Sequence, residues 1–178
     1  MSFSRRSILK SGLAAATAAL VLPRAAAALP QARELSVYHI HTGETLKAAY
    51  FDHGQYQPDA LKAFDKLMRD WRTDTVHTID PAVYDQLFAL QAKVETPGTF
   101  HIICGYRSPA TNTMLSERSD GVAKHSLHMD GQALDLNLPG KDLAQLHAAA
   151  LALRAGGVGY YPASDFIHMD SGRVRSWV

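Results

Sequence analysis

The stretch from Lys124 to Asp135 constrains this chain more than any other. Its informative positions form the pattern S-x-H-x-x-G-x-A-x-D, in which Gly131 lies between His128 and Asp135. Because glycine allows a sharp turn, the imidazole and the carboxylate can meet at one point. We expect His128 at the end of a loop or strand, and Asp135 on a short strand over residues 132–136.

A nitrogen ligand and an oxygen ligand that converge in this way suit Zn²⁺, which binds neutral histidine and carboxylate at about 2.0–2.2 Å. A third ligand is available further along the chain, where His168 lies in the sequence Asp-Phe-Ile-His-Met-Asp. His128, Asp135 and His168 together would supply three protein ligands and leave the fourth position for water. That arrangement is typical of a catalytic zinc rather than a structural one.

The N-terminal segment predicts export. A twin-arginine pattern, Ser-Arg-Arg-Ser-Ile-Leu-Lys over residues 4–10, precedes an alanine-rich apolar run from Gly12 to Leu22 and then small residues suited to cleavage. The run is shorter than the ~20 apolar residues that a membrane-spanning helix needs. We therefore interpret residues 1–28 as a twin-arginine export signal. Residues 29–178 would be the mature domain, which we expect in the periplasm without a membrane span.

The charge of the chain argues against a nucleic-acid partner. The whole sequence carries a formal charge of +1, and removing the four basic residues of the export signal turns this to −3. Nucleic-acid binding would call for lysine and arginine clustered on one face. The mature length of about 150 residues corresponds to one domain with a single core.

Cys104 is the only cysteine, which excludes an intramolecular disulfide. Its neighbours Ile102 and Ile103 are apolar, so the simplest interpretation is a small buried hydrophobic residue. A nucleophilic thiol is the alternative. Two histidines, His39 and His41, fall on one face of a predicted strand. No acid or cysteine lies at a useful spacing from them, so we expect surface or core side chains.

Apolar periodicity predicts an α+β domain. The predicted elements are, in order, a hairpin over 34–51, a helix over 58–72, a helix from 80 to about 96, a strand over 99–104, a helix over 109–118, a strand over 132–136, a helix over 142–154 and strands near 156–162 and 166–169. No repeat or low-complexity linker divides them, so we expect no domain boundary.

The strand over residues 99–104 leads directly to Gly-Tyr-Arg-Ser-Pro, which places Arg107 on a loop that opens a helix. Two interpretations stay open from the local sequence. In the first, Arg107 is a surface residue in a solvated loop. In the second, its guanidinium donates hydrogen bonds to a substrate carboxylate or to an oxygen that becomes negatively charged during the reaction.

Three separated motifs occur in the order in which one known family carries them. They are G-Y-R-S-P from Gly105, S-x-H-x-x-G-x-A-x-D from Ser126, and G-G-V-G-Y-Y-P-x-S-x-F-I-H-x-D-x-G-x-x-R-x-W from Gly156. With these motifs the chain resembles the D-alanyl-D-alanine carboxypeptidase-like zinc peptidases over residues 35–178. The Hedgehog N-terminal domain shares the fold of these peptidases. Within that superfamily the chain is most similar to the murein endopeptidase K branch.

The resemblance implies a small antiparallel sheet with flanking helices, and a zinc ion on His128, Asp135 and His168. It implies hydrolysis of the peptide cross-links of peptidoglycan, and we expect the enzyme to act as a monomer. It also implies that Arg107 holds a carbonyl or carboxylate group of the substrate.

The sequence leaves the general base open. Related carboxypeptidases use a glutamate three residues before the last histidine ligand, and here that position is Asp165, whose side chain is one methylene shorter. Asp170 is the alternative base, or else a carboxylate that holds a ligand in place. His125 is a further candidate neighbour of the site.

Two other functions fit the same motifs. A D,D- or L,D-carboxypeptidase that trims wall peptides would need a closed, basic pocket for the free carboxylate of its substrate, whereas an endopeptidase needs an open groove. A catalytically silent zinc module that binds wall fragments or a partner protein is the third alternative, because a fold alone does not decide function. The motifs do not indicate which type of cross-link is cut.

Overall fold

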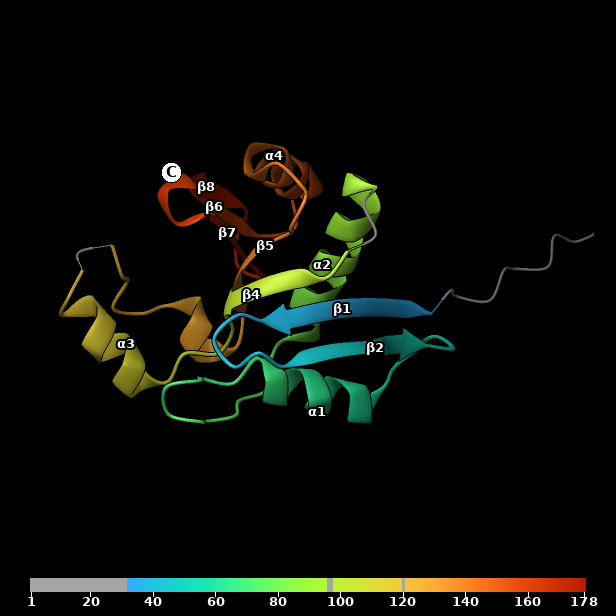
Figure 1. The fold of residues 1–178 in the computed structure, drawn as a ribbon, viewed down its shortest axis with the longest axis horizontal. Coiled ribbons are helices and arrows are strands. Elements are labelled where there is room, and N and C mark those ends of the chain that lie inside the picture. The colour runs from blue at the N-terminus through green and yellow to red at the C-terminus, as the bar shows by residue number, and fades with distance from the viewer. Residues whose placement is uncertain (1–31, 96–97, 120) are drawn as a thin grey trace, which may run out of the picture.

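The structure, a computed structural model, describes residues 32–95, 98–119 and 121–178. The expected export signal over residues 1–28 lies outside these residues. In the part of the chain that is described, a single sheet runs through the molecule with helices packed against it (Figure 1). No helix among the described residues is both long and apolar enough to cross a membrane.

Within the described residues the sheet has eight strands, in the order β3-β2-β1-β4-β5-β7-β6-β8. The strands are β1 (Arg33–His39), β2 (Thr45–Asp52), β3 (Gln55–Tyr56), β4 (Phe100–Cys104), β5 (Ala133–Asn137), β6 (Gly157–Tyr161), β7 (Phe166–Asp170) and β8 (Arg175–Trp177). The α+β class is as expected, and the hairpin is present as β1 and β2. The expectation of a small antiparallel sheet is wrong on both counts. The sheet is larger, and β1 pairs with β4, and β6 with β8, in parallel.

Parallel pairing of β1 with β4 follows from the long connection between them. The helices are α1 (Pro58–Leu67), α2 (Pro81–Val94), α3 (Pro109–Ser116) and α4 (Leu143–Leu153), with short 3-10 turns η1 (Leu127–Asp130) and η2 (Pro162–Ser164). The chain passes through α1 and α2 before β4 returns beside β1, and such a crossover is what parallel neighbours require. Periodicity within one strand does not report this pairing, which is why the sequence did not predict it.

Helices α2, α3 and α4 begin where the sequence contains capping residues. The side chain of Asp80 accepts a hydrogen bond from the N–H of Ala82 at the start of α2. Ser108 and Asp142 cap α3 and α4 in the same way. Each cap satisfies an N–H group that has no partner inside its helix. The predicted starts of these helices are therefore confirmed.

Helix α1 ends at Leu67, several residues before the predicted end at residue 72. The carbonyl of Met68 accepts a hydrogen bond from the N–H of Tyr106 at 2.7 Å, so the chain is tied to the loop after β4 instead of continuing the helix. As a result Trp71, which falls within the predicted helix, lies beyond its end, where it is 37% exposed and stacks on His41.

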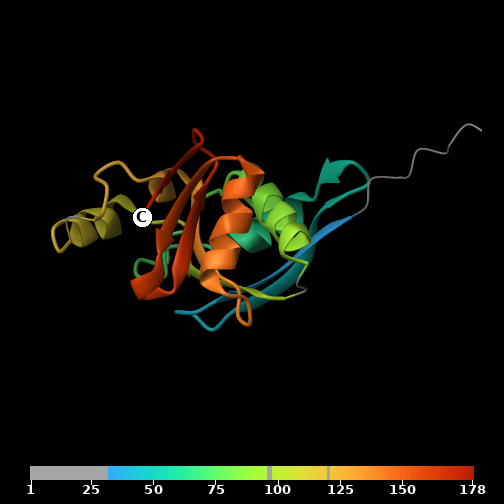
Figure 2. The ribbon, with the colours of Figure 1, turned by 90° about the horizontal axis from the view of Figure 1, so that it is seen from above.

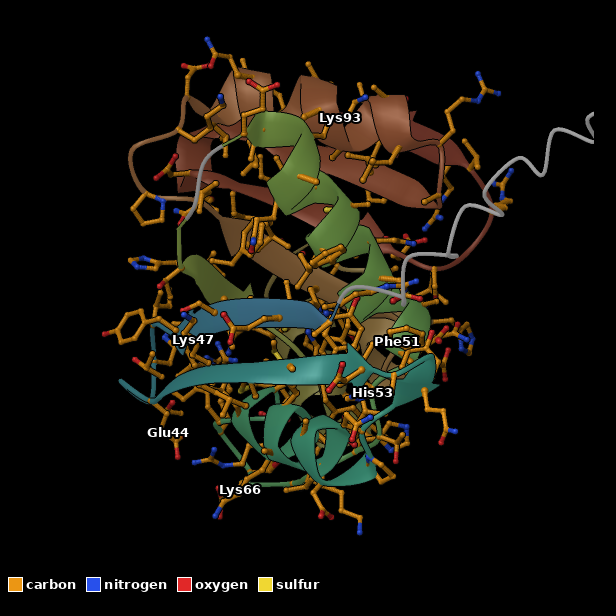
Figure 3. The ribbon with its side chains drawn as sticks, turned by 90° about the vertical axis from the view of Figure 1, so that its right-hand side faces the viewer. Glu44, Lys47, Phe51, His53, Lys66 and Lys93 are labelled. Carbon is orange, nitrogen blue, oxygen red and sulfur yellow. The ribbon has the colours of Figure 1, made fainter. Side chains whose placement is uncertain are left out.

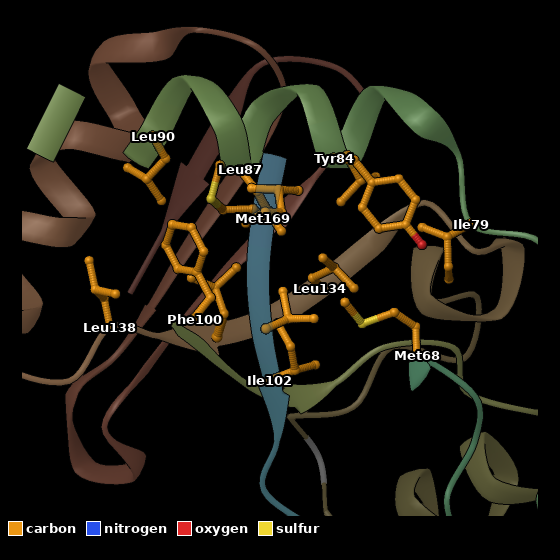
Figure 4. Close-up of a cluster of buried hydrophobic side chains, with 14 of the residues drawn as sticks. Met68, Ile79, Tyr84, Leu87, Leu90, Phe100, Ile102, Leu134, Leu138 and Met169 are labelled. Carbon is orange, nitrogen blue, oxygen red and sulfur yellow. The ribbon is translucent and has the colours of Figure 1, made fainter. Parts of the chain in front are cut away.

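The hydrophobic core lies between the sheet and the helices α1, α2 and α4. Figure 4 shows Leu87 and Leu90 of α2 packed over Phe100 of β4 and Leu134 of β5. Because successive strand residues point to opposite faces, Leu134 and Leu136 enter this core while the residue between them points away from it. Figure 2 shows α2 and α4 side by side over the sheet and α3 standing apart from them. The core thus turns the polar residues of β5 and β7 to the face opposite these helices.

The outer part of the β1–β2 layer is charged. Figure 3 shows Glu44, Lys47 and Lys66 pointing away from this layer; Lys47 and Lys66 are exposed, and Glu44 is half-buried. Lys47 Nζ lies 3.0 Å from a carboxylate oxygen of Glu34 on β1. The two edge strands of the sheet, β3 and β8, have only two and three residues. Short edges and charged neighbours disfavour pairing with the edge of another sheet.

We predict that Gly105→Ala lowers the free energy of unfolding by about 1–3 kcal/mol, the usual cost of overpacking. A Cβ at this position would overlap the carbonyl oxygen of Met68 and lie 2.8 Å from Met68 Cβ. Gly121→Ala is the matched control, because a Cβ there meets only Ser119 Oγ at 3.6 Å. Urea denaturation of both variants measures the difference, and equal stabilities would contradict the prediction.

Candidate metal centre

The structure brings His128, Asp135 and His168 to one point. Asp135 on β5 lies opposite His168 on β7 in the antiparallel ladder, and His128 belongs to η1, which comes directly before β5. Asp135 Oδ1 lies 2.9 Å from His168 Nδ1 and 3.2 Å from His128 Nε2. The two ring nitrogens are 3.2 Å apart. The three residues that the sequence singled out as ligands therefore form one cluster.

Gly131 allows the turn between His128 and Asp135, as the sequence indicated. It ends η1 in the left-handed region, with φ of 67°. A Cβ there would overlap the carbonyl oxygen of Thr78, so a side chain is excluded by packing as well as by backbone conformation. The carbonyl of Gly131 accepts a hydrogen bond from the N–H of Asp80, which fixes η1 against the segment that leads into α2.

The outer nitrogen of each histidine ring is held by an acceptor. His128 Nδ1 donates to the carbonyl oxygen of Gly105 at 2.8 Å, and His168 Nε2 donates to Asp170 Oδ2 at 3.1 Å. Each neutral ring therefore presents its unprotonated nitrogen to Asp135. Partners of this kind set the tautomer and orientation of metal-binding histidines.

This donor set fits Zn²⁺. While both rings are neutral, two nitrogen lone pairs and one carboxylate oxygen face the same point, and none of them can donate a hydrogen bond to another. Ligands held at about 2.1 Å in a tetrahedron lie roughly 3.4 Å apart. The three atoms here are separated by 2.9 to 3.2 Å. A mixed nitrogen and oxygen set suits zinc better than Ca²⁺ or Mg²⁺, which prefer oxygen ligands.

Charge within the cluster favours a bound cation. Burial alone would raise the pKa of Asp135, but His128 and His168 beside it hold that pKa well below its usual range. Burial would lower the pKa of His128, whereas the carboxylate of Asp135 raises it well above the ordinary value. A positive charge is thus stabilised between ring and carboxylate. Because a metal ion must displace a proton from the ring, metal affinity is expected to rise with pH.

Asp170 is fully engaged in hydrogen bonds. Besides His168, its carboxylate accepts from both terminal nitrogens of Arg175 at 2.9 and 2.7 Å, and from the N–H groups of Gly157 and Gly172 at 3.0 and 2.9 Å. Burial would raise the pKa of Asp170, but these donors lower it far below the usual range. Asp170 is completely buried. Of the two roles that the sequence left open for Asp170, this environment favours holding His168.

Asp165 lies at the end of η2 and is exposed, with a left-handed φ of 53°. Its Oδ2 accepts a hydrogen bond from Asn137 Nδ2 at 3.2 Å. It does not belong to the residues that line the pocket over the cluster, whereas Phe166 and His125 do. The role of Asp165 as general base stays a prediction.

Arg107 points toward the cluster with most of its donors unused. Its Nη2 lies 3.8 Å from Asp135 Oδ2 and 3.5 Å from Cys104 Sγ, and its Nη1 is 3.5 Å from Asn112 Oδ1. All of these contacts are long, and Nε is buried with no partner among the described residues. The N–H of Arg107 donates to the carbonyl of His128, which fixes the loop. This placement favours the interpretation that Arg107 binds a substrate oxygen.

A pocket of about 290 Å³ opens over the cluster. The aromatic residues Tyr161, Phe166 and Trp177 form one side of its lining, which also includes most residues of the loop 121–127. Tyr161 stacks on Phe166, and Trp177 Nε1 donates to the hydroxyl of Tyr161 at 2.8 Å. We did not predict this aromatic side from the sequence. Tyr161, Phe166 and Trp177 all belong to the third motif, which begins at Gly156, so this motif could have indicated an aromatic pocket wall.

Cys104 differs from expectation. It is half-buried, and its Sγ, a ring nitrogen of His128 and a carboxylate oxygen of Asp135 all lie within 4.8 Å of one another. Interpreting Cys104 as a small buried hydrophobic residue is therefore wrong. The apolar neighbours in the sequence gave no sign that the thiol faces the ligand cluster.

Two histidines and an aspartate that meet beneath a pocket are typical of metal-dependent hydrolases. The sequence profile described as peptidoglycan L,D-endopeptidase MepK, an M15-type peptidase, matches residues 27–177. Peptidoglycan L,D-endopeptidase MepK of Escherichia coli (strain K12) is 43% identical over 176 residues, covering 98% of this chain and 97% of that protein. The probable peptidoglycan L,D-endopeptidase MepK of Haemophilus influenzae is 41% identical over 161 residues, covering 88% and 87%. The chain belongs to this MepK family of peptidases, and the resemblance inferred from the motifs is confirmed.

We predict that Asp170→Asn weakens Zn²⁺ binding by about 10–100-fold, the usual effect of removing the partner of a metal-binding histidine. The amide keeps the shape of the side chain but loses the charge that His168 and Arg175 require. Competition with a chromophoric chelator measures the affinity. Asp165→Asn is the control, since Asp165 makes no contact with the cluster among the hydrogen bonds of the described residues. Equal affinities in the two variants would contradict the prediction.

Proposed function

We propose that this chain hydrolyses L,D peptide bonds in the cross-links of peptidoglycan, with one Zn²⁺ held by His128, Asp135 and His168. The observation that carries the proposal is the convergence of two nitrogen lone pairs and a carboxylate within 3.2 Å at the floor of a pocket. Membership of the MepK family supports the substrate class and the type of bond.

When bound, Zn²⁺ polarises a peptide carbonyl and lowers the pKa of a coordinated water toward about 7. The other roles belong to the side chains of this chain. The Gly105 carbonyl and Asp170 hold the outer nitrogens of the two histidine rings and so orient the inner nitrogens toward the metal position. Arg107 donates hydrogen bonds to a carbonyl or carboxylate oxygen of the cross-link from the side of Asp135. The aromatic side formed by Tyr161, Phe166 and Trp177 packs against apolar parts of the peptide.

Asp165 is our candidate for the proton acceptor. Its exposed carboxylate keeps lone pairs free, whereas every oxygen of Asp170 is already bound to donors. A base must come within about 2.6–3.2 Å of its water. Because Asp165 lies outside the lining of the pocket, the turn that carries it has to approach the cluster when substrate binds.

The proposed function also requires that the protein is exported from the cytoplasm. The twin-arginine pattern over residues 4–10 is typical of a route that carries folded proteins, and a peptidoglycan substrate lies outside the cytoplasm. We propose that residues 1–28 are removed and that residues 29–178 act in the periplasm as a monomer.

The first experiment is digestion of purified, cross-linked peptidoglycan by the mature chain, with the released muropeptides read by mass. We expect cross-linked dimers to disappear, chelation to abolish the activity, and Zn²⁺ to restore it. Loss of terminal residues alone would instead indicate a carboxypeptidase. Intact dimers in the presence of one bound zinc would indicate a binding module.

A second prediction concerns Asp165. We expect Asp165→Asn to lower kcat/KM by about 10²–10⁴-fold, the range for loss of a general base, with unchanged zinc content. Asp165→Glu restores the carboxylate with a longer arm and should retain activity. If Asp165→Asn turns over at the native rate, the proton is taken by another group, and His125 in the pocket lining is the next to test.

A further inference from the structure

The pairing of β4 with β5 contains an irregularity beside the metal centre. His101 pairs with Asn137 and Ile102 with Leu136, but the next pair joins Cys104 to Asp135. In a regular antiparallel ladder Ile103 would lie opposite Asp135. The extra residue is a β-bulge, which changes the direction of side chains and is often found next to active sites. Here the bulge sets a thiol, rather than an isoleucine, across from a metal ligand.

The thiol is one member of a set of ligand atoms. Cys104 Sγ lies within 4.8 Å of a ring nitrogen of His128 and of a carboxylate oxygen of Asp135. The side chains of His128 and Asp135 are 3% and 9% exposed, and their free lone pairs point to the same place. A zinc–sulfur bond is about 2.3 Å long, so the sulfur would move toward the other two ligand atoms when metal binds. The remaining contacts of Sγ, to Arg107 Nη2 at 3.5 Å and the Gly105 carbonyl at 3.6 Å, are weak.

We propose that Cys104 is a fourth protein ligand of the metal, which makes the resting site a cysteine, two histidines and an aspartate. The inference rests on the metal site of the proposed function. Forming the metal–sulfur bond breaks the S–H bond and releases its proton to solvent. The guanidinium of Arg107 lies beside the resulting thiolate and offsets its charge.

Two properties follow from a sulfur ligand. A thiolate is a soft donor, so the site favours Zn²⁺, Co²⁺ and Cd²⁺ over hard cations such as Mg²⁺ and Mn²⁺. The sulfur would also take a coordination position that water otherwise fills, so access of water to the metal would depend on Cys104. A cysteine that merely fills space beside the site would do neither.

The test is the absorption spectrum of the mature chain loaded with Co²⁺. We expect a thiolate-to-cobalt charge-transfer band in the near ultraviolet, and Cys104 is the only residue that can produce it, because the chain has no other cysteine. Cys104→Ser, of nearly the same size, should lose the band but still bind one Co²⁺, and should bind Zn²⁺ at least about tenfold more weakly. Ile103→Val is the matched control in the same bulge and should keep both the band and the affinity.

The outcomes separate this inference from the proposed function. One bound Co²⁺ in the native chain without the band would overturn the role of Cys104 and leave the three-ligand site intact. No bound Co²⁺ in the native chain would overturn both. Should Cys104→Ser fail to fold, Cd²⁺ binding to the native chain gives the answer through its own thiolate charge-transfer band, whose absence overturns the inference.

Discussion

The antiparallel pairing of β5 with β7 is the constraint on which the candidate metal centre depends. It sets Asp135 directly opposite His168. Because side chains alternate along a strand, the same register sends Leu134 and Leu136 into the core beneath α2. A slip of one residue would place a carboxylate in the core and a leucine in the pocket. The hydrophobic core therefore enforces the register, and the register positions two of the three proposed ligands.

The third ligand is placed by backbone groups rather than by packing. The carbonyl of Gly105 binds the outer nitrogen of His128, and the N–H of Tyr106 binds the carbonyl at the end of α1. One short loop after β4 thus orients a ligand, ends a helix and presents Arg107. These close contacts leave no room for a side chain at position 105, which explains why the loop has a glycine there.

The sequence predicted the parts of the site that depend on local spacing. His128, Gly131 and Asp135 lie within one short motif, and His168 belongs to a second, so their meeting could be anticipated. The size of the sheet and its parallel pairs depend on contacts between distant segments, and local periodicity contains no information about them. The place of Cys104 depends on a bulge that shifts one strand against another, and neither strand shows this in its own pattern. The end of α1 was missed because the loop after β4 competes with helical hydrogen bonding.

The ring nitrogens of His128 and His168 meet across a separation of 40 residues in the chain. A metal ion bound between them would therefore also act as a removable link that closes a long loop of the folded chain. Since η1 is hydrogen-bonded to the segment before α2, the effect reaches beyond the pocket into the main core. Any ligand that binds only the native state adds to its stability in proportion to the logarithm of its free concentration. The resistance of the whole domain to unfolding, and not only its activity, is thus coupled to how much metal its surroundings supply.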